Sequence, residues 1–341
     1  MIYRSLLVLL ITALPFTLAA KERPIRVGAS PVASTVGIFL AQDLGHFRQE
    51  GVEIKLQIFS ASASPMMPLL ARGELDVGGG NITAGLFNAK AQDVSLYLVA
   101  DKGQVRRDAQ YSKILVREAL WKKNYRGAKD LQGLRVGLPA ITGTTGEAAL
   151  DRYLKTAQLS VRDVKLVKLA SYADCNRALA QGDIDATVQI EPYLTAALDE
   201  KIARVAASVY DLHPDQQSAA LFFSPGFATT ERRRALAFLR AYLRGIRYYN
   251  EALRRGRQSE EWRQVVKTLA TWTSTKDEQI LQRIEAIGLH PDGALNLASI
   301  QSDAEFFLRA GHVSELGDLR SLIKTDLVEE AARQLAAREK K

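Results

Sequence analysis

The chain of 341 residues is 47% hydrophobic and 25% charged, with a mean hydropathy near zero, a composition typical of a globular protein. It is longer than the size at which one hydrophobic core stops growing, so we expect two lobes, and its single cysteine excludes an internal disulfide. The net charge of +8 is spread along the chain without a base-reading motif, which argues against nucleic-acid binding.

The first 20 residues have the layout of a secretory signal peptide. Arg4 precedes an apolar run over 6–14, Pro15 follows that run, and small residues end the segment at Ala19 and Ala20. We expect cleavage after Ala19 or Ala20 and an exported, periplasmic protein. A buried first helix or a retained anchor is the alternative, although the run is shorter than the roughly 20 residues that cross a bilayer.

Strand and helix patterns alternate through the middle of the chain. The first elements predicted are a strand at 25–29, a helix at 36–47, an alternating strand at 52–59, a helix at 65–73 and a strand end at 75–77 followed by three glycines. The pattern recurs with strands at 134–138, 164–169 and 185–190 and helices at 147–157 and 173–181. This order predicts two similar α/β halves, each with a parallel sheet covered by helices.

The last third of the sequence is mainly helical. Apolar residues recur at helical spacing from Ala235, and Gly256 can end that helix. Thr275 with Glu278 fits a capping box for the next helix. A turn at 291–293 then precedes an amphipathic stretch at 295–310.

Five segments, taken in order, carry a family resemblance. They read IRVGASPVASTVGIFLAQDLGHFRQEGVEI, LLARGELDVGGGNITAGLFNA, DLQGLRVGLPAITGTTGEAALDRYL, GDIDATVQIEPY and LHPDGALNLASIQSDAEFFLRAG. Over nearly all of its length after residue 20, the chain resembles the substrate-binding proteins of ABC importers for sulfonates, nitrate, taurine and thiamine-pyrimidine precursors.

The resemblance implies an α/β, two-lobed type II periplasmic-binding-protein fold with a helical C-terminal region. Lobe one would then comprise residues 21–111 and 205–341, and lobe two residues 112–204. The two crossings between the lobes, expected at 101–112 and 203–210, would form a hinge. A solute held between the lobes favours the closed form, because contacts to both lobes exist only there.

The resemblance also implies the partners of the protein. These are a small polar or anionic solute (a sulfonate, oxyanion, carboxylate or pyrimidine-like molecule) and the permease and ATPase of an inner-membrane ABC importer. A sensor that presents its solute to a membrane receptor is an alternative within the same fold. An enzyme resembling the pyrimidine synthase of thiamine biosynthesis would need a cysteine-rich motif that this sequence lacks.

Polar loops that enter helices mark the candidate solute site. In an open α/β sheet, ligands bind beyond the carboxyl ends of the strands, where the free N–H groups of helix N-termini favour negative charge. Two such loops fall in the first lobe, with Ser30, Ser34 and Thr35 after the first strand and Gly80 and Asn81 after the third. Ser, Thr and Asn also cap helices, so capping alone is the competing interpretation.

A third polar loop falls in the second lobe. Thr142, Thr144 and Thr145 precede a helix, and Thr144 with Glu147 also fits a capping box. Capping uses only one hydroxyl, so the other threonines and the loop amides are expected to face an anion.

The fourth loop holds Gln189, Glu191 and Tyr193, at a position where the family commonly places ligand contacts. Gln189 would form a hydrogen bond with the solute, and Tyr193 would supply an aromatic wall. Glu191 would either accept a hydrogen bond from the solute or pair with a basic residue of the opposite lobe. Direct contact with Glu191 would disfavour a purely anionic solute.

Patterns for catalysis and metal binding are absent from the sequence. His46, His213, His290 and His312 are isolated, and no HExxH motif, cysteine pair, G-x-S-x-G elbow or P-loop occurs. Cys175 lies on a predicted helix and is expected to be a buried thiol. We therefore expect no catalytic residue, no metal and no cofactor.

Overall fold

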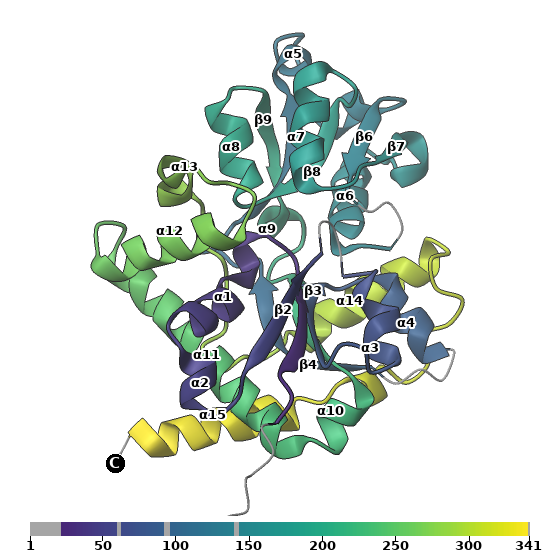
Figure 1. Cartoon of the computed structure of the whole chain (residues 1–341). Coiled ribbons are helices and arrows are strands. Elements are labelled where there is room, and N and C mark those ends of the chain that lie inside the picture. Colours follow the sequence, from purple (N-terminus) through teal and green to yellow (C-terminus); the bar gives the residue numbers. More distant parts are fainter. Residues whose placement is uncertain (1–21, 60–62, 92–95, 140–142, 340–341) are drawn as a thin grey trace, which may run out of the picture.

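The computed structural model describes residues 22–59, 63–91, 96–139 and 143–339, which form two β-sheets flanked by helices (Figure 1). The predicted signal peptide and Thr142 lie outside the described residues. Among the described helices, none combines the length and the apolar character that crossing a bilayer requires.

The first sheet has the strand order β2-β1-β3-β10-β4. Its strands are β1 (Ile25–Ala29), β2 (Ile54–Ile58), β3 (Val77–Asn81), β4 (Tyr97–Gln104) and β10 (Gln217–Phe223). β1 is parallel to both β2 and β3, with Val27 opposite Leu56 on one side and Val77 on the other. β10 lies between β3 and β4 and is antiparallel to both.

The second sheet has the order β7-β6-β8-β5-β9. Its strands are β5 (Ser112–Arg117), β6 (Arg135–Leu138), β7 (Lys165–Lys168), β8 (Ala186–Ile190) and β9 (Ala203–Ser208). β6 is parallel to β7 and β8, whereas β5 is antiparallel to β8 and β9. Both sheets are therefore mixed, and the prediction of parallel sheets is wrong for β5 and β10. Each of these strands directly follows a passage from the other sheet. It therefore begins at the end of its sheet where the parallel strands have their carboxyl ends, and it runs antiparallel to both neighbours.

Helices cover the faces of both sheets (Figure 1). Around the first sheet are α1 (Val36–Asp43), α2 (His46–Gln49), α3 (Met66–Ala71), α4 (Ala84–Ala91), α10 (Pro225–Thr229), α11 (Arg232–Arg255), α12 (Glu260–Trp272), α14 (Leu297–Arg309) and α15 (Asp326–Glu339). Around the second are α5 (Glu118–Trp121), α6 (Thr145–Lys155), α7 (Tyr172–Gln181), α8 (Tyr193–Asp199) and α9 (Val209–Leu212). The short α13 (Glu278–Arg283) packs between α12 and α8 and so touches both halves.

The predicted strands and helices are present, with two corrections at helix ends. The helix predicted at 36–47 is divided into α1 and α2, because Gly45 takes the left-handed conformation at φ 71° between them. The capping box predicted for Thr275 and Glu278 is wrong. Asp277 caps α13 instead, and its side chain accepts a 2.8 Å hydrogen bond from the backbone N–H of Gln279.

The glycine run that follows the predicted third strand is itself part of β3. A Cβ atom at Gly80 would lie 2.6 Å from the Cβ of Ala63, and one at Gly78 would lie 2.8 Å from Leu70. A Cβ at Gly79 would lie 3.2 Å from the aliphatic stem of Lys102. Only glycine lets other groups approach this central strand so closely.

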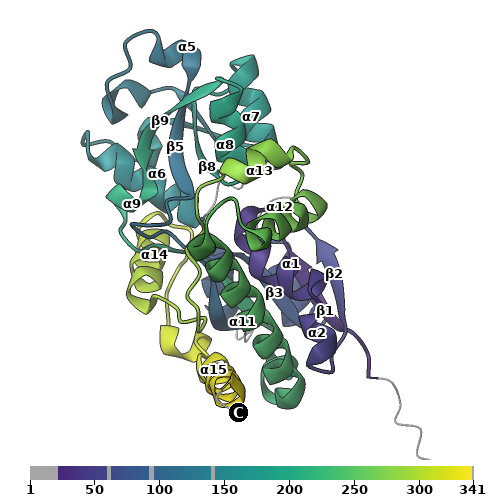
Figure 2. The ribbon, with the colours of Figure 1, turned by 90° about the vertical axis from the view of Figure 1, so that its left-hand side faces the viewer.

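The helices α11, α12 and α15 lie with α1 on one side of the first sheet, whereas α14 lies with α4 on the other (Figure 1 and Figure 2). The long helix α11 crosses α1 at Gly37 and Gly245, where a Cβ on Gly245 would lie 2.2 Å from the carbonyl oxygen of Gly37. Further along α11, the buried Tyr242 donates a 2.7 Å hydrogen bond to the carbonyl oxygen of Asp101 in β4. These contacts fix the position of β4, which carries part of the site described next.

Candidate functional site

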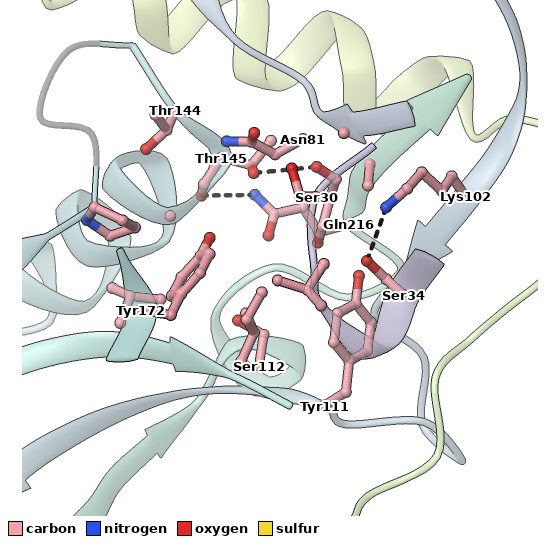
Figure 3. A pocket seen from close by; sticks show the side chains of 18 of the residues that line it. Ser30, Ser34, Asn81, Lys102, Tyr111, Ser112, Thr144, Thr145, Tyr172 and Gln216 are labelled. Atoms are coloured by element: carbon pink, nitrogen blue, oxygen red, sulfur yellow. Dashed lines mark hydrogen bonds between the residues drawn. The ribbon is translucent and has the colours of Figure 1, made fainter. Parts of the chain in front are cut away.

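A cavity lies between the two sheets, at the carboxyl ends of β1, β3, β6 and β8 (Figure 3). Its volume is about 50 Å³, taken as the space open to the centre of a water-sized sphere. Since one water needs roughly 10–15 Å³ by that measure, the cavity holds a few waters or one small polyatomic solute. The lining residues are Ser30, Val32, Ser34, Gly80, Asn81, Lys102, Tyr111, Ser112, Leu138, Pro139, Thr144, Thr145, Gly146, Tyr172, Val188, Ile190, Gln216, Ser218 and Ala219.

The loop after β1 brings two of its three predicted residues to the cavity. Ser30 and Ser34 line it, whereas Thr35 is buried beside it and donates a 2.7 Å hydrogen bond to the carbonyl oxygen of Ser30. No side chain caps the short 3-10 helix at Ala33–Thr35, so helix capping does not explain the polar residues of this loop. Ser30 Oγ is buried and makes no hydrogen bond within the described residues.

At the end of β3, Gly80 and Asn81 both line the cavity. The side-chain oxygen of Asn81 accepts a 3.0 Å hydrogen bond from the backbone N–H of Ala63. This bond fixes the side-chain amide at the cavity wall.

The loop before α6 brings Thr144 and Thr145 to the cavity from the second half. Thr144 caps α6 by accepting a 3.1 Å hydrogen bond from the N–H of Glu147. The reciprocal half of the predicted capping box is absent, because the Glu147 carboxylate accepts a bond from the N–H of Gly143 and contacts His312 Nε2 at 2.8 Å. Thr145 donates to the carbonyl oxygen of Ser218 at 3.3 Å, so this loop touches the first sheet.

The residues predicted after β8 do not line the cavity. Val188 and Ile190 line it, and because side chains alternate along a strand, Gln189 points the other way and donates to Tyr172 O and Asn176 Oδ1. Tyr193 donates a 3.1 Å hydrogen bond to the carbonyl oxygen of Pro31, so it joins the two halves beside the cavity.

Glu191 is fully buried and bonded to protein groups. Its carboxylate accepts hydrogen bonds from the N–H and hydroxyl of Thr195 and, at 2.9 Å, from the N–H of Glu285. Burial raises the pKa of Glu191 to about 7, although these hydrogen bonds, taken alone, would lower it. The sequence predicts that Glu191 either contacts the solute or pairs with a basic residue of the opposite lobe. It does bond across to Glu285, but the partner is a backbone N–H and not a basic side chain.

Sequence reasoning missed Lys102, Tyr111 and Tyr172 among the lining residues. Figure 3 shows the polar ends of Lys102, Ser34 and Tyr111 together at one side of the cavity, with Tyr172 at the other. The one available signal was Lys102 itself, a charged residue next to Asp101 at the end of the apolar run 98–100. Lys102 Nζ donates to Ser34 Oγ at 3.2 Å, and burial lowers its pKa to about 7.

The comparison with known protein families decides the family of the chain. The model of the NMT1-like family matches residues 18–268, which is more than half of the sequence. The chain belongs to the NMT1-like family. No curated protein matches it.

Solved structures show that this NMT1-like chain has the α/β fold of periplasmic binding proteins, as predicted. The ligand-binding component of an ABC-type import system from Staphylococcus aureus, solved with zinc bound, has a TM-score of 0.74 at 15% identity and covers 92% of this chain and 100% of its own. The alkanesulfonate-binding protein SsuA of Xanthomonas axonopodis pv. citri, bound to MOPS, has 0.70 at 21%, with 90% and 100% covered. The periplasmic nitrate-binding protein NrtA of Synechocystis PCC 6803 has 0.72 at 13%, with 92% and 89% covered.

The groups that line the cavity of the NMT1-like chain suit hydrogen bonding to a small solute. Hydroxyl groups come from both halves, whereas the side-chain amides of Asn81 and Gln216 and the ammonium group of Lys102 come from the first. Leu138, Val188 and Ile190 form an apolar part of the wall. Within the described residues, no cluster of three histidine, cysteine or acidic side chains is arranged to hold a metal ion. The cavity is therefore enclosed by polar and apolar groups from both halves.

Proposed function

We propose that the chain is the periplasmic solute-binding component of an ABC importer, and that it captures a small polar or anionic solute in this cavity. The observation that carries the proposal is the composition of the cavity wall. Asn81 and Lys102 come from the first sheet, and Thr144 and Thr145 come from the loop before α6. A solute that contacts both halves stabilises the form in which they are together.

We further propose that residues 21–111 and 205–341 form lobe one and residues 112–204 form lobe two. The passage from β4 to β5, at residues 105–111, supports the first of these boundaries, since it lies inside the segment expected at 101–112. The second passage runs from β9 through α9 to β10, at residues 209–216, and overlaps the segment expected at 203–210 only at its end. Because β9 belongs to the second sheet, we place the second boundary after β9 and not at residue 204. Contacts across the two halves also border the cavity. The N–H of Ala84 donates to the carbonyl oxygen of Gly143 at 2.7 Å, and Thr83 and Thr144 form an isolated β-bridge.

Export and delivery complete the proposed function. Residues 1–20 serve as a cleaved signal peptide, and the permease and ATPase of an inner-membrane importer receive the solute. The similar structures support this role, since they include a component of an ABC-type import system and a periplasmic nitrate-binding protein.

Thermal unfolding of the mature protein with a panel of solutes tests the proposal. The panel contains methanesulfonate, taurine, nitrate, acetate and a hydroxymethylpyrimidine. A bound solute at 100 times its Kd stabilises the folded form by about 2.7 kcal/mol, so at least one member should raise the Tm by several degrees. Small-angle X-ray scattering should then show a smaller radius of gyration with that solute than without it.

Two results would count against solute capture. One is a panel that leaves both the Tm and the radius unchanged. The other is a solute that binds but whose affinity is unaffected by substitution of Asn81 and Thr145 with alanine, because such a solute occupies another place.

A further inference from the structure

Lys102 occupies an unusual position in the first sheet. Asp101 pairs with Ala220 of β10 and Gly103 pairs with Ala219, so Lys102 is an extra residue between two successive pairs, which is a β-bulge. Bulges redirect side chains near functional sites. The stem of Lys102 passes over Gly79 of β3, where a side chain would collide with it, and the ammonium group reaches the cavity.

No charged group neutralises Lys102 at the cavity. It is the only charged side chain among the described lining residues. The neighbouring Asp101 does not line the cavity, and its carboxylate already accepts hydrogen bonds from Gly103 N, Gln217 Nε2 and His290 N at 2.8, 2.6 and 2.6 Å. Among the residues that the structure describes, the Lys102 ammonium group donates a single hydrogen bond, to the neutral hydroxyl of Ser34.

The other groups that face Lys102 are neutral. On β3 it meets Gly79, on the 3-10 helix Ser34, and on β10 the cavity wall is formed by Ser218 and Ala219. Tyr111 and Tyr172 are the remaining titratable residues of the wall, and burial raises the pKa of both, so both are uncharged near neutral pH. A buried ammonium group without a counterion is unfavourable in such surroundings.

Hydroxyl groups beside Lys102 are also incompletely hydrogen-bonded. Among the described residues, Ser30 Oγ is buried without a hydrogen-bond partner, and Tyr111 Oη and Ser218 Oγ are buried with no well-aligned hydrogen bond, although these two hydroxyls face each other. All three residues line the cavity. Buried polar groups are nearly always satisfied, so an acceptor in the cavity would complete the hydrogen bonding of Ser30 and of the Tyr111 and Ser218 hydroxyls.

We propose that the solute of this site is a small, permanently ionised monoanion that supplies the missing counterion of Lys102, and that wherever the free amine is neutral its binding adds a proton to that amine. The inference rests on the proposed function and specifies the class of solute. The acid form of the buffer supplies the proton and becomes its conjugate base: the neutral amine of Lys102 takes the proton up, and the resulting ammonium group pairs with the anion. No bond of the anion is broken.

The uptake of a proton predicts how affinity depends on pH. Burial lowers the pKa of Lys102 to about 7 in the free protein, against a weaker attraction from Asp101, and an adjacent anion raises it again. Affinity is therefore constant below pH 7 and falls by about tenfold for each pH unit above it, because only the protonated fraction is competent.

Isothermal titration calorimetry at pH 5.5, 7 and 8.5 tests the inference, with each pH measured in two buffers of different ionisation enthalpy. Methanesulfonate and nitrate serve as anions because neither titrates in this range, and dimethyl sulfone and nitromethane serve as neutral counterparts of similar size. We expect proton uptake to rise from near zero at pH 5.5 to near one at pH 8.5. Lys102→Met should abolish both anion binding and uptake, whereas Lys165→Met, at an exposed position of β7, should change neither.

The outcomes separate the two proposals. Anion binding without proton uptake at pH 8.5, or binding of the neutral compounds with equal affinity, overturns the role of Lys102 and leaves solute capture standing. Absence of binding by all four compounds overturns the inference, and solute capture is then judged on the wider panel. If Lys102→Met does not fold, the proton uptake of the unaltered protein still decides the question.

Discussion

The burial of Lys102 affects the stability of the free protein as well as binding. Its pKa falls from an ordinary value of 10.5 to about 7 in the folded protein. Between these values the unfolded chain holds a proton that the folded chain does not, so stability rises with pH across this window. Below pH 7 the full cost of burying the charge remains, and at 1.36 kcal/mol for each pKa unit its upper limit is about 5 kcal/mol.

Replacing Lys102 with methionine should therefore stabilise the solute-free protein. We expect the free energy of unfolding in urea to rise by roughly 1–4 kcal/mol at pH 6, because the apolar side chain fills the same space without a charge to bury. The gain should shrink as the pH approaches 10. A gain that does not change with pH would show that packing, and not charge, causes it; the exposed Lys165→Met is again the matched control.

Single residues also show why most of the residues that line the cavity were not predicted. The hydroxyl-rich loops before helices indicated Ser30, Ser34, Thr144 and Thr145 correctly as residues at the cavity. The sequence could not predict which side chains of β8 point into the cavity. A strand that is buried on both sides lacks the alternation of apolar and polar residues that distinguishes its two faces. Which residues of that strand reach the cavity depends on how the sheet is packed.

At the scale of elements, the loop before α6 meets the start of α4 backbone to backbone. Gly143 has a φ of 62°, and a Cβ placed on it would lie 2.2 Å from the Cβ of Ala84. The same contact contains the 2.7 Å hydrogen bond from Ala84 N to Gly143 O. The two halves can therefore approach this closely only if the residue at position 143 is glycine.

Gly143→Ala should weaken solute binding more than it weakens the fold. We expect a loss of at least tenfold in affinity by calorimetry, because the new methyl group holds the loop away from α4. Gly133→Ala is the matched control, since Gly133 also has a positive φ, 75°, but open space around it. Both variants should lose about 1–2 kcal/mol of stability from the left-handed backbone. Equal affinities of the two variants would contradict the proposed closure contact.

Elements also differ in how well the sequence predicts them. Periodicity and turn signals predicted β1, β2, β3, β6, β7 and β8, but the sequence analysis did not predict β4, β5, β9 or β10. The β-bulge at Lys102 left no such signal, because it arises from pairing with β10, which comes after the whole second sheet in the chain. The direction of β5 and β10 likewise follows from the path of the chain between the sheets and not from local composition.

At the scale of the whole molecule, side-chain bridges on both sides of the cavity join the two halves. On one side Arg152 of α6 pairs with Asp303 of α14 at 3.1 Å and donates to Ser302 at 2.9 Å. On the other side Arg283 pairs with Asp199 and Lys113 with Glu285, both at 2.5 Å. The C-terminal region therefore contacts the second half as well as the first.

Removing the bridge between α6 and α14 should shift the molecule toward an open form. For Arg152→Ala we expect a loss of about 1–2 kcal/mol in solute binding, near tenfold in Kd, since Arg152 is mostly buried and Asp303 fully so. Asp303 keeps Gln216 and His213 as partners, so the fold should persist. X-ray scattering of the solute-free variant should give a larger radius of gyration. Arg263→Ala, which breaks an exposed pair with Glu260 on α12, should leave both quantities unchanged.

The backbone contact between Gly143 and Ala84 has a consequence for selectivity. Side chains adapt to a guest by changing rotamer, but main-chain atoms already at hydrogen-bond distance have no such freedom. An oversized molecule therefore keeps the two loops apart however well its polar atoms are matched. Redesign of the lining side chains would alter which chemistry is preferred, while the upper limit on size would stay where the main chain sets it.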